Sequence, residues 1–186
     1  YSFSDNQKKT IEEFIARGGK VIAIGGAVSQ FEDREGFHLT KFATEDEKTQ
    51  AQKILEEQEL ADRFLEVENA ERRSISSFVP GAIVENKLDK THPLSYGLGE
   101  QYYSLKTSEN KYKLLKGAQN IIYVPKNYQS SGFIGYKLKK SLEETVTFAI
   151  DNYGQGKVIY MIDNPLFRGF WENGILLFSN ALFLVN

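Results

Sequence analysis

The sequence predicts an α/β fold with a doubly wound, mostly parallel sheet and helices on both of its faces. Two short apolar runs, residues 20–24 and 157–162, carry this prediction, because continuous β-branched runs are typical of strands buried on both faces. Glycines border both runs, and a helical pattern precedes the first and follows the second. The order helix, buried strand, glycine turn and helix is typical of such layered folds.

Three helices are expected around these strands. Apolar residues recur at helical spacing from Asp5 or Asn6, either of which can cap a helix, to the glycine pair at 18–19. A short second helix is expected at residues 27–31, after a glycine turn. The last helix is expected over residues 167–184.

The middle of the chain adds strands and a charged insertion. Residues 41–73 are highly charged with a thin apolar stripe, and glycine and proline are absent from them, so we expect a mostly solvated helical insertion. The alternative is a helix that binds a partner. Further strands are expected at residues 82–85, 101–105, 120–124 and 145–150.

Composition limits the classes of function. The 186 residues carry 23 Lys and Arg against 25 Asp and Glu, a net charge of −2, which excludes a broad basic surface for nucleic acid. Cysteine is absent, so no disulfide, thiolate metal site or cysteine nucleophile can form. Only two histidines, His38 and His92, are present, which excludes a histidine-rich metal site. No apolar window is long enough to span a bilayer, and the length is typical of one domain with a sizeable core.

The first candidate site is the turn at Gly25 and Gly26. Ligands of open α/β sheets bind beyond the carboxyl ends of strands, where a sharp turn can present a nucleophile or cradle an anion. Gly25 occupies the position of such a nucleophile, so no reactive side chain is presented there. The alternative is a tight turn in a packed sheet.

The second candidate is His92, in the loop before Pro93. An unperturbed imidazole has a pKa suited to a general base. No nucleophile partner is evident in the sequence, and a lone histidine before proline is more often a hydrogen-bonded structural residue.

The third candidate lies between the second apolar run and the last helix. Asp163 and Arg168, beside the aromatic Trp171, could bind a small polar ligand. The alternative is that Asp163 or Asn164 caps the last helix, that Asp163 pairs with Arg168, and that the aromatic side chains of residues 167–171 lie in the core.

Five segments together resemble the glutamine-amidotransferase-like domain that follows the catalytic domain in a group of bacterial zinc carboxypeptidases of the carboxypeptidase A type. The segment around His92 and the motif Phe-Arg-x-Phe-Trp are the specific parts of this resemblance, which covers nearly the whole chain. It implies a flavodoxin-like fold for one domain over residues 1–186. The segments are residues 16–25, 80–83, 89–97, 167–171 and 178–181.

The same resemblance implies that the chain is catalytically inert. Active class I amidotransferases carry a cysteine at the elbow and a His-Pro-Glu element after a late strand. Gly25, Asn164 and Leu166 stand at the matching positions here, so no amidotransferase activity is expected. The fold would also lack its N-terminal strands, so we expect a piece of a longer protein, or a sheet completed by a partner chain.

Two functions follow as expectations. The first is a non-catalytic accessory domain of a zinc carboxypeptidase, with a structural, substrate-contacting or assembly role. The peptidase domain of the same parent would be its partner, a homo-oligomer stays open, and nucleic acid and membrane are not expected as partners. Zinc would be bound only in the peptidase domain, this chain would hold no cofactor, and the location would be extracellular or periplasmic.

The second function is that of a hydrolase or carbohydrate-processing relative of the same fold. Such folds also occur in trehalose-utilisation-like proteins and in a β-galactosidase trimerisation domain. In this alternative His92, Asp163 and Arg168 converge in one cleft.

Overall fold

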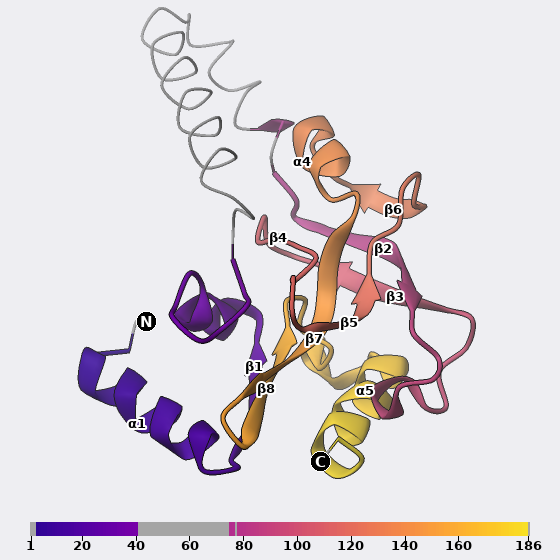
Figure 1. Cartoon of the computed structure of the whole chain (residues 1–186). Coiled ribbons are helices and arrows are strands. Elements are labelled where there is room, and N and C mark those ends of the chain that lie inside the picture. The colour runs from indigo at the N-terminus through magenta and orange to yellow at the C-terminus, as the bar shows by residue number, and fades with distance from the viewer. Residues whose placement is uncertain (1–2, 41–74, 77, 186) are drawn as a thin grey trace, which may run out of the picture.

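The computed structural model describes residues 3–40, 75–76 and 78–185, and it shows a mixed α/β fold built on one eight-stranded sheet. The expected insertion at residues 41–73 lies outside the described residues. The sheet order is β1-β8-β7-β5-β2-β3, with β4 paired to β7 and β6 paired to β2 (Figure 1). The strands are β1 Lys20–Ile24, β2 Gly81–Leu88, β3 Gln101–Lys106, β4 Tyr112–Lys113, β5 Gln119–Tyr123, β6 Ser130–Phe133, β7 Thr145–Tyr153 and β8 Gly156–Met161.

The expectation of a mostly parallel sheet is wrong. Among the described strands, β1 and β8 form the one parallel pair, and every other pairing is antiparallel. The physical reason is the length of the connections. Strands β7 and β8 are joined by a tight turn in which Tyr153 pairs with Gly156, whereas a parallel crossover needs a dozen or more residues.

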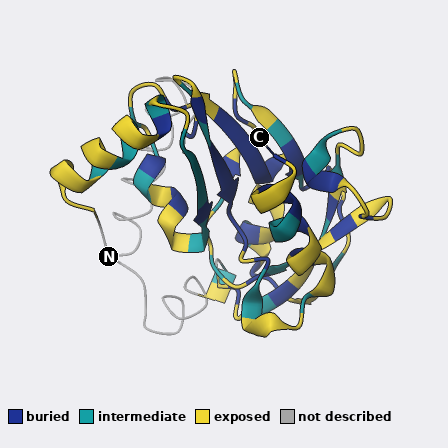
Figure 2. Ribbon diagram, turned by 90° about the horizontal axis from the view of Figure 1, so that it is seen from below, coloured by how far each residue is buried: buried dark blue, intermediate teal, exposed yellow. Residues whose placement is uncertain are grey.

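Helices cover both faces of the sheet, as expected. On one face Ile15 of α1 and Phe31 of η1 pack in a cluster with Tyr160. On the other face Leu177 of α5 packs in a cluster with Ile159. Figure 2 shows the buried residues concentrated in the strands between these layers. The helices are α1 Asp5–Ala16, α4 Tyr136–Ser141 and α5 Glu172–Phe183, with the 3-10 helices η1 Gly25–Phe31, η2 Pro93–Ser95 and η3 Phe167–Gly169.

The beginnings of two helices differ from the expectation. Ser4, not Asp5 or Asn6, caps α1: its Oγ accepts a hydrogen bond from the Gln7 amide at 3.4 Å, and the Gln7 side chain accepts from the Ser4 amide in return. The last helix begins at Glu172, several residues later than expected.

The late beginning of α5 has a backbone cause. Arg168 and Gly169 both take a positive φ, +52° and +69°, which ends η3 before α5 can begin. Neither Asp163 nor Asn164 therefore caps α5, whose N-cap is Trp171.

Among the described residues, no helix is both long enough and apolar enough to cross a bilayer.

Candidate functional site

The carboxyl ends of β1 and β8 meet at one edge of the sheet. Ile24 pairs with Met161, so the turn at Gly25 and the segment at Asp163 both leave this edge. Ligands of α/β proteins bind at such an edge. However, β1 is outermost among the described strands, so Gly25 does not follow a central strand of a parallel sheet, as an amidotransferase elbow would.

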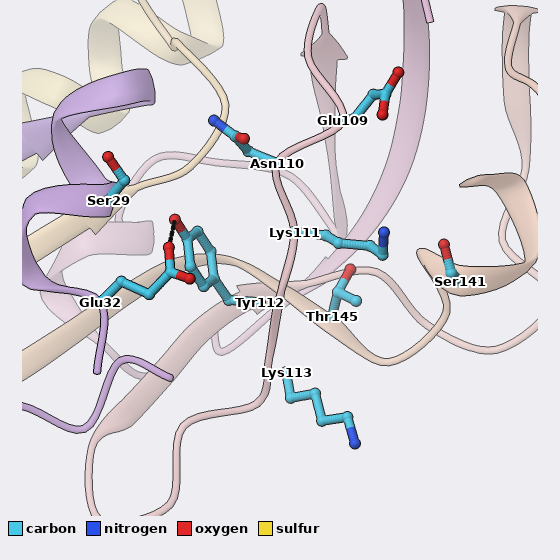
Figure 3. Close-up of a pocket in the computed structure, with 9 residues that line it drawn as sticks. All are labelled: Ser29, Glu32, Glu109, Asn110, Lys111, Tyr112, Lys113, Ser141 and Thr145. Atoms are coloured by element: carbon cyan, nitrogen blue, oxygen red, sulfur yellow. Dashed lines mark hydrogen bonds between the residues drawn. The ribbon is translucent and has the colours of Figure 1, made fainter. Parts of the chain in front are cut away.

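A cavity of about 600 Å³, here called the carboxyl-edge cavity, opens beside η1 at this edge (Figure 3). It is bounded by η1, by the segment 109–113, by α4 and by the start of β7. Both carboxylates and ammonium groups line it, together with hydroxyls. The lining residues are Ser29, Glu32, Glu109, Asn110, Lys111, Tyr112, Lys113, Ser141 and Thr145.

The segment 109–113 presents its side chains alternately to two sides. Asn110 and Tyr112 point toward η1, whereas Lys111 points toward Ser141, as Figure 3 shows. The Tyr112 hydroxyl donates to Glu32 Oε2 at 3.2 Å. Burial raises the pKa of Tyr112, and the charge of Glu32 raises it further, so the phenol stays protonated and remains a donor.

A buried ion pair contacts one segment of the cavity wall. Lys106 Nζ lies 2.9 Å from Asp163 Oδ1, and the Ser104 hydroxyl donates to Asp163 Oδ2 at 2.7 Å. Lys106 also donates to the backbone carbonyl of Asn110, a residue that lines the cavity. The pair therefore ties the carboxyl end of β8 to the cavity segment.

The ion pair continues into a polar chain across three strands. The Asn86 amide donates to Ser104 Oγ at 3.1 Å, and Thr147 donates to Asn86 Oδ1 at 2.5 Å. All of these side chains are buried. Burial raises the pKa of nearby Tyr102, and the charge of Asp163 adds to this effect.

A second buried carboxylate, Asp151, was missed by the sequence analysis. His38 Nδ1 lies 2.7 Å from Asp151 Oδ1, and the His38 amide donates to Oδ2 at 2.7 Å. Tyr160 donates to the same Oδ2 at 3.1 Å. His38 and Asp151 are 113 positions apart, so no local motif could have indicated this contact.

His92 is a capping residue and not part of the carboxyl-edge site. Its Nδ1 accepts from the Leu94 amide at 3.1 Å and so caps η2. Burial lowers its pKa, against the opposing charge of Asp89. It lines a cavity of about 340 Å³ with Lys157, at the start of β8.

Asp163 lies beyond the opposite end of β8. At the rise of a β-strand, Lys157 and Asp163 are about 20 Å apart. The structure therefore does not bring His92, Asp163 and Arg168 into one cleft. The prediction that these three residues converge is wrong.

The other predicted residues divide between turns and the surface. Arg168 is exposed and stacks over the Phe167 ring at 5.2 Å, so it does not pair with Asp163. Trp171 is half-buried, not in the core, and its indole donates to the Tyr103 carbonyl at 2.8 Å.

Asn164 and Leu166, the two positions aligned with the His-Pro-Glu element, form a turn. The Leu166 amide donates to Asn164 Oδ1 at 2.9 Å. At Gly25 and Gly26, no described residue beyond the neighbouring backbone comes within 4 Å of where a Cβ would stand. Within the described ranges, no three or more acidic or histidine side chains gather closely enough to hold a metal ion.

Comparison with known proteins gives a structural likeness but no family. No family model matches the chain, and no curated protein matches it. A crystal structure of a ThuA-like protein from Bacteroides uniformis superposes with a TM-score of 0.51 at 13% identity. The match covers 96% of this chain and 63% of that one, and it supports the α/β fold alone.

Proposed function

We propose that this chain is a non-catalytic domain of the amidotransferase-like fold that binds a small zwitterionic molecule, a free amino acid or a peptide end. The observation that carries the proposal is the carboxyl-edge cavity. Its size of about 600 Å³ suits a small ligand, and its lining carries charges of both signs, from Glu32, Glu109, Lys111 and Lys113. An amino acid carries one group of each sign, so it complements this lining.

Two features support binding without turnover. Gly25, which follows the outermost strand β1 and is matched to a nucleophile position by the sequence resemblance alone, carries no side chain. Both oxygens of Asp163, the acidic residue at the end of β8, accept hydrogen bonds from Lys106 and Ser104. A carboxylate held this way has less capacity to act as a general base than a free one.

The sequence resemblance extends the proposal to the parent protein. As an accessory domain of a zinc carboxypeptidase, the chain would contact peptide C-termini or released amino acids through this cavity. The peptidase domain would be its partner and would alone hold zinc, outside the cell or in the periplasm. The ThuA-like likeness supports the α/β fold on which this extension rests.

Nuclear magnetic resonance titration of the chain tests the proposal. The probes are free amino acids, a short peptide with a free C-terminus, and the same peptide amidated. We expect amide shifts at residues 109–113 and 141–145, and about tenfold weaker binding of the amidated peptide because it lacks the carboxylate.

The matched variants are Lys111→Gln, which should weaken binding, and Lys140→Gln, an exposed lysine outside the cavity lining, which should not. Equal binding of the free and amidated peptides would contradict the zwitterion assignment. Glutaminase turnover by the purified chain would overturn the non-catalytic assignment.

A further inference from the structure

Exposed aromatic side chains gather where β3 meets the amino end of α5. Tyr103 is 42% exposed and Phe170 57% exposed, and half-buried Trp171 is the N-cap residue of the helix. With Glu172 and Asn173 they line a hollow of about 310 Å³, here called the aromatic hollow. Exposed clusters of large apolar side chains commonly mark binding surfaces.

The rings of the aromatic hollow are held in place before any ligand arrives. The Trp171 indole donates to the Tyr103 carbonyl at 2.8 Å, and the Tyr103 hydroxyl donates to Gln101 Oε1 at 2.9 Å. The Phe170 and Trp171 rings lie 5.8 Å apart at 67°. Because the polar atoms of Trp171 and Tyr103 are already hydrogen-bonded, little ordering of these side chains would be needed on binding.

The charges around the hollow favour an uncharged ligand. The amino end of α5 has no side-chain cap, so its helix dipole places partial positive charge there. Arg168, stacked on Phe167, adds a full positive charge nearby, since Phe167 contacts the Phe170 ring. These groups offset the Glu172 carboxylate, so the site does not have the net negative character that a quaternary ammonium cage needs.

We propose that the aromatic hollow binds a neutral carbohydrate. A pyranose ring has an apolar face of C–H groups that can lie on one of the two rings, Phe170 or Trp171, while the other ring, at 67° to it, contacts the edge of the sugar. Its hydroxyls can donate to the Glu172 carboxylate and exchange hydrogen bonds with the Asn173 amide, both of which are exposed at the rim. This site is distinct from the carboxyl-edge cavity, and its ligand does not depend on the proposed function of that cavity.

Trp171 makes the test direct, because it is the single tryptophan of the chain. Its fluorescence is followed during titration with neutral oligosaccharides of glucose, mannose, xylose and N-acetylglucosamine, and with tetramethylammonium. We expect a saturable change with at least one oligosaccharide. Phe170→Ala should weaken that binding about tenfold, the loss of one stacking contact.

The matched control is Phe183→Ala, which removes an exposed aromatic ring, 72% exposed, at the other end of α5. It should leave the titration unchanged. Three results would overturn the proposal: no saturable change with any oligosaccharide at millimolar concentration, a response to tetramethylammonium alone, or equal weakening by both variants. Lys111→Gln should leave this titration unchanged, because the two linings share no residue, so the two proposals can fail separately.

Discussion

Lys106 and Asp163 form an ion pair whose side chains are only 4% and 5% exposed, with 2.9 Å between Nζ and Oδ1. Removing two charges from water is costly, and the surrounding hydrogen bonds from Ser104 and to the Asn110 carbonyl offset that cost. The pair joins the end of β3 to the segment after β8. It therefore holds the wall of the carboxyl-edge cavity as well as the fold.

Lys106→Met should strongly destabilise the chain, because it leaves the Asp163 carboxylate buried without its cation. We expect a loss of about 3–5 kcal/mol in the free energy of unfolding, measured by urea denaturation. Adding Asp163→Asn removes the second charge and should recover much of that loss. Lys140→Met, at an exposed lysine, is the matched control and should change stability little. A Lys106→Met effect no larger than the control would show that the pair contributes nothing to stability.

The sequence was sufficient to predict the elements that local pattern determines. The β-branched runs became β1 and β8, and helices were found on both faces of the sheet. The direction of the strands was wrong because period and composition do not encode pairing. The connection Gly154-Gln155-Gly156 held the missing signal, since so short a turn can join only antiparallel neighbours.

The buried polar contacts could not be predicted from sequence for a different reason. Every second residue of β3 is buried: Tyr102, Ser104 and Lys106. Two polar residues therefore occupy buried positions at which the alternating pattern predicts apolar side chains. By pattern Lys106 belongs at the surface, and only contact with Asp163, 57 positions away, allows it to be buried. Such pairs depend on the tertiary arrangement alone.

Two substitutions around the buried carboxylate of Asp151 should lower the stability by different amounts. Asp151 is completely buried and accepts from the His38 amide and the Tyr160 hydroxyl. Tyr160→Phe removes one donor, with an expected loss of about 1–2 kcal/mol, while Asp151→Ala leaves the donors without an acceptor and should cost about 3 kcal/mol or more. Thermal unfolding of the parent and both variants measures which substitution lowers the stability more. A Tyr160→Phe protein less stable than Asp151→Ala would contradict it.

Gly25 and Gly26 are neighbouring glycines that differ in the sign of φ, so substituting each by alanine measures the cost of a side chain at a positive φ. Beyond the neighbouring backbone, no described residue comes within 4 Å of a Cβ at either position, so a methyl group would meet no clash with the rest of the described structure. Gly25 has φ +56°, whereas Gly26 has no positive φ. Gly25→Ala should therefore lose about 1 kcal/mol or more, and Gly26→Ala should stay within about 0.5 kcal/mol of the parent. Equal effects in chemical denaturation would show that the turn is not strained.

The lowered pKa of His92 predicts that the free energy of unfolding depends on pH, and its direction gives the sign. Burial lowers the pKa of His92, and the positive charge of Lys157 lowers it further. The negative charge of Asp89 acts in the opposite direction. A histidine whose pKa is lower in the folded state is fully stabilising above its unfolded pKa of about 6.5, and stability is lost as pH falls below that value. Protonation at Nδ1 also removes the acceptor of the Leu94 amide.

His92→Asn separates the titration from the cap, because an asparagine at an N-cap still offers an oxygen to the Leu94 amide. We expect the variant to match the parent near neutral pH and to lose less stability as pH falls from about 7 to 5, the range around the unfolded pKa. The difference between the two curves, measured by urea denaturation at each pH, isolates His92 from His38, which both proteins retain. Parallel curves over this range would show that His92 carries none of the pH dependence.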